Sequence, residues 1–178
     1  MKKYKSFGEK FRNRELPQKS SRCMFRESET DFFSDEEILE LLNSLLEAER
    51  AGARAVSALS HQSDDTADRS TLHEIAVDEG RFCAMLTNHI IRFNGLPSLK
   101  TGEFLNKIMA LESFDEKLEL LDRGQFWVVR KLQGALSRIG DEKLHDDLMD
   151  MLEVHEINMK SAAALRTSRG TLTTPGVN

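Results

Sequence analysis

The stretch NGLPSLKTGEFLNKIMALES, residues 94–113, decides how this chain is arranged. It opens with an Asn-Gly pair and a nearby proline, a combination that ends helices. It closes on Ser113, which with Glu116 forms the capping box that starts the next helix. We expect a short helix over 101–111 between these two signals. The connection is therefore long enough to carry the chain from one end of a helical bundle to the other.

Apolar residues recur at helical spacing on both sides of this stretch. The pattern predicts helices at about 34–59 and about 68–93 before it, and at about 113–139 and about 142–166 after it. The connections within each pair are short, so paired helices are antiparallel neighbours, and only the middle connection is long. This predicts an all-α fold, a ferritin-like four-helix bundle with a short extra helix in the crossover. A plain up-down-up-down bundle, with the short helix across one end, is the alternative.

The two ends of the chain differ from this helical region. Residues 1–30 contain nine Lys and Arg against four Asp and Glu, so the rest of the chain carries a net charge of −10. We interpret residues 1–33 as a basic, mobile N-terminal extension, 34–167 as the bundle and 168–178 as a disordered C-terminal tail. A basic arm for an acidic partner or an anionic surface is the functional alternative for the extension.

Composition excludes several classes of protein. No apolar run approaches the roughly 18–20 residues of a membrane span, and no secretory signal is expected. Two cysteines, without a CxxC motif, exclude a disulfide framework and favour a cytoplasmic location. The net charge of −5 argues against a nucleic-acid partner. We therefore expect a cytoplasmic protein without a membrane span, and a homodimer. Phe126 and Trp127 are candidates either for packing of their own helix or for dimer contacts.

Each predicted helix carries polar residues near its middle, where its apolar stripe should continue. They are Glu49, Glu79, Gln125 and the cluster Glu153, His155 and Glu156. A buried carboxylate needs a metal ion, a cationic partner or a proton. Carboxylates that converge with an imidazole from four helices are how di-iron and di-manganese bundles hold their ions. Three glycines beside these positions, Gly52, Gly80 and Gly124, would permit close helix approach or ligand access.

Five segments carry a resemblance to an uncharacterised bacterial family of ferritin-like domains. They are LNSLLEAERAGAR (42–54), DEGRFCAML (78–86), NHIIRFNGLPS (88–98), DRGQFWVVRKL (122–132) and MLEVHEIN (151–158). The resemblance covers roughly residues 35–165 and implies the fold more than any chemistry. By position, Glu49 resembles the first-helix carboxylate of the ferritin-like superfamily, Glu79 the glutamate of its second-helix Glu-x-x-His, and Glu153 and Glu156 its last-helix pair.

This sequence departs from the superfamily pattern at three positions. Phe82 stands where the second helix should offer a histidine, Gln125 stands where the third should offer a carboxylate, and His155 is one residue from the usual place. The other helical histidines, His73, His89 and His145, are expected at the surface or at helix ends.

Two hypotheses therefore remain open, and whether the protein is an enzyme is open with them. In the first, Glu49, Glu79, Glu153, His155 and Glu156 bind iron or manganese for redox or oxidant-handling chemistry, and Gln125, Arg54 and Arg130 support them by hydrogen bonds. In the second, the protein is a metal-free interaction or structural module, and arginines pair with the same core carboxylates.

Overall fold

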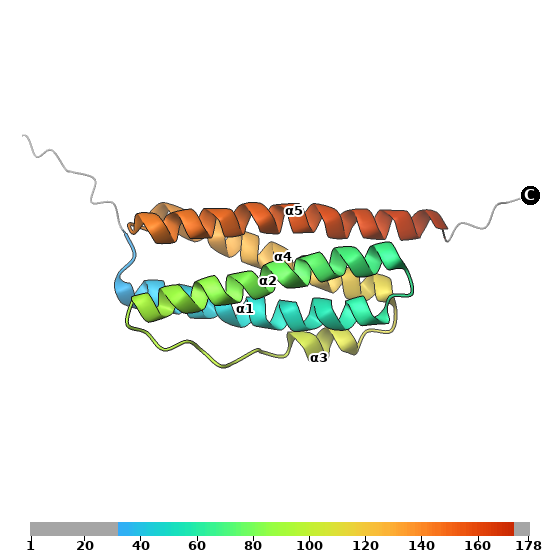
Figure 1. The fold of residues 1–178 in the computed structure, drawn as a ribbon, viewed down its shortest axis with the longest axis horizontal. Coiled ribbons are helices and arrows are strands. Elements are labelled where there is room, and N and C mark those ends of the chain that lie inside the picture. The colour runs from blue at the N-terminus through green and yellow to red at the C-terminus, as the bar shows by residue number, and fades with distance from the viewer. Residues whose placement is uncertain (1–31, 173–178) are drawn as a thin grey trace, which may run out of the picture.

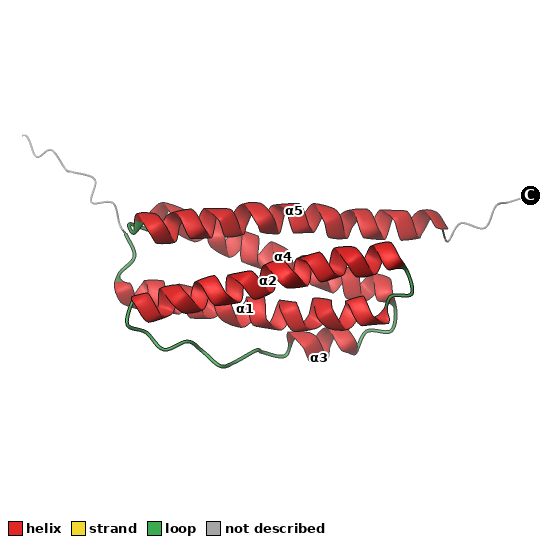
Figure 2. Ribbon diagram, in the orientation of Figure 1, coloured by secondary structure: helices red, strands yellow, loops and turns green. Residues whose placement is uncertain are grey.

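The computed structural model describes residues 32–172, and residues 1–31 and 173–178 lie outside the described part. Within it the chain is helical and contains no strand (Figures 1 and 2). The elements are α1 (Asp35–Gln62), α2 (Thr66–Arg92), α3 (Phe104–Met109), α4 (Phe114–Ala135), the 3-10 turn η1 (Leu136–Arg138) and α5 (Glu142–Leu172). Most of the expected N-terminal extension, and the tail from residue 173 onwards, lie outside the described residues. Helix α5 continues to Leu172, beyond its expected end at about Arg166.

Side-chain caps fix where the long helices begin. In α1 the Ser34 backbone N–H donates to Glu37 Oε2 at 2.8 Å, and the Ser34 side chain accepts from the Glu37 N–H. Ser113 and Glu116 repeat this capping box in α4. Asp65 caps α2 by accepting from Ala67 N–H at 2.7 Å, which explains why α2 begins two residues before the expected Asp68.

The helices form two antiparallel hairpins, α1 with α2 and α4 with α5 (Figure 1). The crossover after α2 runs back along the outside of α1 to the other end of the bundle, and it carries α3 there. As a result α2 and α4 point the same way, which requires the single long crossover and excludes the up-down-up-down alternative. No helix in the described region is long and apolar enough to cross a membrane.

The crossover is hydrogen-bonded to one face of α1. Asn43 Oδ1 accepts from the Ser98 backbone N–H at 2.6 Å, and Glu47 Oε1 accepts from the Ser98 hydroxyl. Arg50 Nη1 donates to the carbonyl oxygens of Ser98 and Lys100 at 2.7 and 3.0 Å. These bonds hold the irregular segment in one path, and that path brings α3 to the half of the bundle that contains the second apolar cluster, where Ile108 is buried.

The buried apolar residues fall into two clusters, one towards each end of the bundle. The first includes Leu42, Leu46, Phe82, Leu132 and Leu148, and the second includes Val56, Leu72, Ile75, Leu118 and Leu165. In each of the four long helices, the polar position singled out from the sequence falls between the two clusters. A polar layer therefore divides the core.

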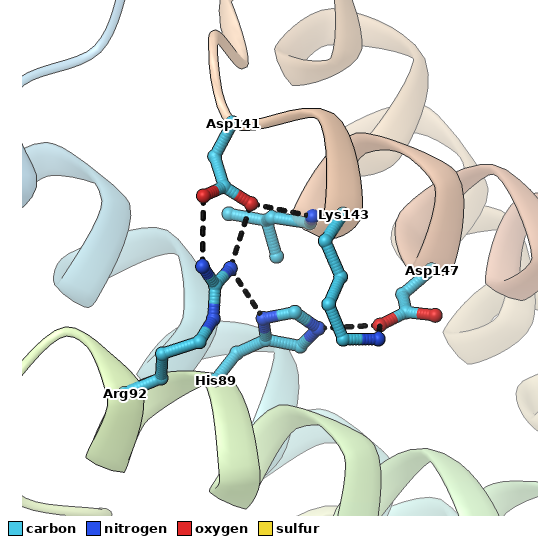
Figure 3. A network of polar contacts seen from close by, with 6 residues as sticks. His89, Arg92, Asp141, Lys143 and Asp147 are labelled. Atoms are coloured by element: carbon cyan, nitrogen blue, oxygen red, sulfur yellow. Dashed lines mark hydrogen bonds and ion pairs between the residues drawn. The ribbon is translucent and has the colours of Figure 1, made fainter.

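A cluster of polar side chains joins the end of α2 to the start of α5 (Figure 3). It consists of His89, Arg92, Asp141 and Asp147. Arg92 donates to both carboxylate oxygens of Asp141 at 2.8 and 2.7 Å, and also to Nδ1 of His89 at 3.0 Å. Because Arg92 can only donate, His89 Nδ1 is the acceptor and its Nε2–H donates to Asp147 at 2.6 Å. His89 lies in the last turn of α2, in line with the expected helix-end position, but it is only 3% exposed, because Asp147 and Arg92 satisfy its ring nitrogens beneath the surface.

We expect Asp141→Ala to lower the free energy of unfolding by about 1–2 kcal/mol at pH 7, from the lost cap and the lost ion pair. Asp141 also accepts from the Leu144 N–H at 2.7 Å and so caps α5. The Arg92 hydrogen bond and then the Leu144 N–H lower the pKa of Asp141 to about 2. Its contribution is therefore present above the ordinary aspartate pKa of 3.8 and is lost as the pH falls through about 2.

Urea unfolding of the wild type and the variant between pH 2 and pH 7 tests this. The difference between them should shrink at the acid end. Asp146→Ala, at an exposed neighbouring position, should change stability by no more than about 0.5 kcal/mol. A difference that stays constant down to pH 2 would contradict the prediction.

Candidate functional site

Four polar side chains meet in the layer between the two apolar clusters, one from each long helix. Glu49 comes from α1, Glu79 from α2, Gln125 from α4 and His155 from α5. Their exposed fractions are 2%, 1%, 5% and 1%. Groups of this polarity are costly to bury, so their partners decide what the layer can do.

The four side chains contact one another in two pairs. His155 Nε2 lies 3.2 Å from Glu49 Oε1, and Gln125 Nε2 donates to Glu79 Oε1. His155 Nδ1 lies 2.9 Å from the Met151 carbonyl oxygen. A carbonyl can only accept, so Nδ1 carries a proton and Nε2 is the nitrogen directed at the carboxylate.

Each of the four side chains also has a buried atom without a hydrogen-bond partner in the described part of the chain. These atoms are Glu49 Oε2, Glu79 Oε2, Gln125 Oε1 and His155 Nε2. The three oxygens are acceptors only, unless a carboxyl takes a proton. A buried acceptor that stays unsatisfied costs about 1–3 kcal/mol. The layer therefore has unused capacity for a cation or for donors.

Burial governs the charges of this layer. Burial, reinforced by the charge of Glu49, holds the pKa of Glu79 well above its usual range, although the Gln125 hydrogen bond opposes this shift. Burial also raises the pKa of Glu49 against the opposing effect of His155. Burial alone would lower the pKa of His155, but its contact with Glu49 outweighs this and raises it. Glu49 and His155 thus form an ion pair, and burial disfavours the charged form of Glu79 as long as no cation faces it.

A missing side chain makes room for Glu79. A Cβ added at Gly52 in α1 would lie 2.8 Å from Cδ of Glu79, closer than real Cβ atoms approach other groups. Gly80, which was expected to act with it, is exposed, and an added Cβ there would meet nothing within 4 Å. Of these two glycines, only Gly52 shapes the layer.

Phe82 closes the layer beside His155. It lies one turn after Glu79, at the position where the superfamily pattern places a histidine. Its ring centroid is 5.4 Å from that of the imidazole, and Phe82 is fully buried. As a result α2 directs only one metal-ligating side chain into the layer.

A pocket of about 410 Å³ reaches the layer from the α1–α4 side. Glu49, Glu79 and Gln125 are part of its lining, and so are mainly apolar residues of α1 and α4. One wall is Phe104 of α3, which can approach α4 because Gly124 has no side chain: an added Cβ would lie 2.9 Å from Phe104 Cζ. The short crossover helix therefore belongs to the site, which its sequence did not indicate.

The other residues proposed from the sequence do not reach this layer. Glu153 and Glu156 are exposed on α5, and Glu156 accepts from Gln133 instead. The reason is helix geometry: successive residues are about 100° apart, so with His155 inward its neighbours at 153 and 156 point elsewhere. Arg54 is exposed and donates to Thr101, and Arg130 is exposed over the Phe126 ring. No arginine contact within residues 32–172 supports an arginine–carboxylate core network.

In their present positions, the carboxyl groups of Glu49 and Glu79 and the imidazole of His155 do not surround a common point. In the part of the chain that the structure describes, no group of three or more His, Cys, Asp or Glu side chains is placed to hold a metal ion. A metal ion would therefore have to draw Glu49, Glu79 and His155 together by side-chain rotation.

Comparisons with known proteins support the fold. The model of a family described as a domain of unknown function, DUF6306, matches residues 36–164. No functionally curated protein matches the chain significantly.

Two solved structures are similar to this chain. One is the dodecameric thioferritin of Bacteroides fragilis, a bacterioferritin-related protein, with a TM-score of 0.67 at 12% identity, covering 79% of this chain and 90% of that one. The other is a two-domain protein of Anabaena variabilis with DJ-1/ThiJ/PfpI-like and ferritin-like domains, with a TM-score of 0.66 at 13% identity. That match covers 83% of this chain but only 41% of the longer protein. These likenesses confirm the expected ferritin-like fold, and at such identities they show the fold alone.

Proposed function

We propose that this chain, which belongs to the DUF6306 family, binds one divalent iron or manganese ion in its polar layer. The ligands are Glu49, Glu79 and His155. The observation that carries the proposal is the set of buried oxygen and nitrogen atoms without a hydrogen bond that the four long helices direct to one level of the core. Two carboxylates and an imidazole are a donor set that suits these metals. The His155 Nδ1–H bond to Met151 resembles the hydrogen bonds that orient metal-binding histidines.

The donor set supports one ion rather than two. Phe82 removes the second donor of α2, Glu153 and Glu156 face solvent, and Gln125 offers an amide where a carboxylate would be needed. Gln125 instead holds Glu79 by its Nε2–H. A bound iron or manganese ion would supply redox or oxidant-handling chemistry, and the pocket would give small molecules access to it.

The metal-free structural module is the second candidate. The Glu49–His155 ion pair favours it, because this pair already satisfies part of the charge without any ion. In this form the core network consists of that pair and the Gln125–Glu79 hydrogen bond, with no arginine from the described residues.

Metal retention distinguishes the two candidates. The full chain is loaded aerobically with Fe(II), and separately with Mn(II), then desalted and analysed by plasma mass spectrometry. We expect about one equivalent in the wild type, the same in Glu153→Gln, whose carboxylate is exposed, and none in Glu79→Gln. No retained metal in the wild type, or equal retention in all three proteins, would contradict the proposed site. Two equivalents would contradict the single ion.

The homodimer and the cytoplasmic location remain proposals. Phe126 and Trp127 are 49% and 46% exposed on α4, which leaves both available for a partner. The mass of the full chain in solution, measured by analytical sedimentation, tests whether it is a homodimer.

A further inference from the structure

The pocket above the polar layer has a lining that suits one chemical class of ligand. Its walls are largely apolar and include two aromatic rings, Phe104 and Trp127. Its volume of about 410 Å³ lies in the range of small-molecule sites. Its polar lining is dominated by acids: Glu47 and Glu103 lie with Glu49 and Glu79, against a single cation, Lys107.

The innermost side chains of the pocket offer hydrogen-bond acceptors. Glu49 Oε2, Glu79 Oε2 and Gln125 Oε1 are buried and unpartnered. The amide donor of Gln125 is turned to Glu79, so its free atom is the carbonyl oxygen. His155 and Glu49 face each other. An anion would meet the four carboxyl groups that line the whole pocket. A neutral apolar molecule would leave the buried acceptor oxygens without hydrogen bonds.

We propose that this pocket binds a protonated primary amine with a small apolar or aromatic body. The ammonium group has N–H donors and no acceptor, so it complements a lining whose unpartnered atoms are oxygens of Glu49, Glu79 and Gln125. Hydrogen bonds between ionised partners are the strong ones in a buried site. The body of the ligand lies along the apolar walls, where Phe104 and Trp127 contact it.

This inference goes beyond metal binding and does not depend on it. A metal ion and an ammonium group would use the same carboxylate oxygens, so each should exclude the other. Amine binding is therefore a property of the protein without metal, and added metal should displace the amine only where the proposed metal site also exists.

Calorimetric titration of the chelator-treated full chain tests the proposal with three probes of one shape: benzylamine, benzyl alcohol and benzoate. We expect saturable binding of benzylamine with one site, at least about tenfold weaker binding of benzyl alcohol, and none of benzoate, because only the amine brings charged donors. Equal affinity for amine and alcohol, preference for benzoate, or no binding of benzylamine would overturn the proposal.

Three substitutions test whether benzylamine binds in this pocket. Ser44 lines the pocket on α1, so Ser44→Trp should fill it and weaken benzylamine binding at least about tenfold. Ser57→Trp is the matched control, since Ser57 is exposed on the same helix and outside this pocket. Glu79→Gln keeps the shape and removes one carboxylate, and it should also weaken the amine but not the alcohol. Unchanged benzylamine affinity in both Ser44→Trp and Glu79→Gln would overturn the assignment.

Competition separates this proposal from the metal proposal. If both hold, Mn(II) should displace benzylamine from the wild type. Amine binding without metal retention would refute the metal site and leave the amine site standing, and metal retention without amine binding would do the reverse. Helix content by circular dichroism checks that each variant is folded.

Discussion

Replacing His155 with leucine is expected to lower the free energy of unfolding of the metal-free protein by about 3–5 kcal/mol at pH 7, the usual cost of breaking a buried ion pair from one side. His155 Nε2 lies 3.2 Å from Glu49 Oε1, in a layer where the carboxyl groups of Glu49 and Glu79 are almost fully buried. Without it, Glu49 and Glu79 are left with one amide between them. Urea unfolding in the presence of a chelator measures the effect.

The pH dependence of this loss has a definite sign. Burial raises the pKa of Glu49 above 4.5, and His155 is the group that opposes that rise. In His155→Leu the pKa of Glu49 should therefore rise further. A carboxyl group with a raised pKa stabilises the fold below its unfolded value and loses this contribution as the pH rises through its folded value. The raised pKa of His155 stabilises the wild type fully only below the ordinary histidine value of 6.5, so the penalty of the variant should shrink as the pH is lowered from 6.5 towards 5.

Two further variants make this prediction decisive. Glu49→Leu combined with His155→Leu removes both charges and should recover most of the loss, since replacing a whole buried pair by apolar residues is often neutral. Glu153→Gln, on the exposed side of the same helix, should stay within about 0.5 kcal/mol of the wild type. A single variant that costs less than about 1 kcal/mol would show that the pair does not hold the layer.

A pair of glycine-to-alanine substitutions should change stability in opposite directions. Gly80→Ala, in the exposed interior of α2, should raise the free energy of unfolding by about 0.5–1 kcal/mol, because alanine loses less conformational entropy. Gly52→Ala gains the same helix propensity in α1. Its Cβ, however, would lie 2.8 Å from Cδ of the buried Glu79, so we expect a net loss of about 1–3 kcal/mol from overpacking.

The cause of the loss can be isolated in a double variant. Gly52→Ala with Glu79→Ala removes the clashing carboxyl group, so the added methyl should no longer cost stability relative to Glu79→Ala alone. Thermal and urea unfolding of the four proteins give the required differences. Gly52→Ala that is as stable as Gly80→Ala would mean that Glu79 can move aside freely, and the layer would then be less constrained than its geometry indicates.

Local signals in the sequence were sufficient for the fold. Ser34 with Glu37 and Ser113 with Glu116 mark helix starts by hydrogen bonds within four residues, so sequence alone identifies them. The connection lengths then determined which helices run antiparallel. The predicted ends of the last two long helices were less exact. Helix α4 tightens into a 3-10 turn after Ala135, and α5 continues to Leu172.

The sequence predicted an inward-facing side chain correctly only where a single polar residue interrupts the apolar face of a helix. Glu49 and Glu79 are lone polar residues among apolar neighbours, so their inward direction could be inferred. Glu153, His155 and Glu156 lie within one turn, and apolar spacing cannot decide which of three polar residues faces the core. Arg54 and Arg130 are close to the layer in sequence, but long cationic side chains keep their charge in water.

The remaining features depend on contacts between distant segments. Phe104 forms a wall of the pocket only because Gly124, on another helix, lets it approach. His89 is buried because Asp147, 58 residues away, and Arg92 satisfy its ring nitrogens. Neither pairing leaves a local pattern in the sequence.

The single crossover also limits how the chain can be rearranged. It makes α1 and α5 run in the same direction, so α1 begins at one end of the bundle and α5 finishes at the other (Figure 1). A helix of 31 residues, the length of α5, spans about 46 Å. A circular permutation that joins Asp35 to Leu172 would need a linker of at least about 14 extended residues to cover that span. A new opening between α1 and α2, by contrast, would interrupt only the short connection at residues 63–65.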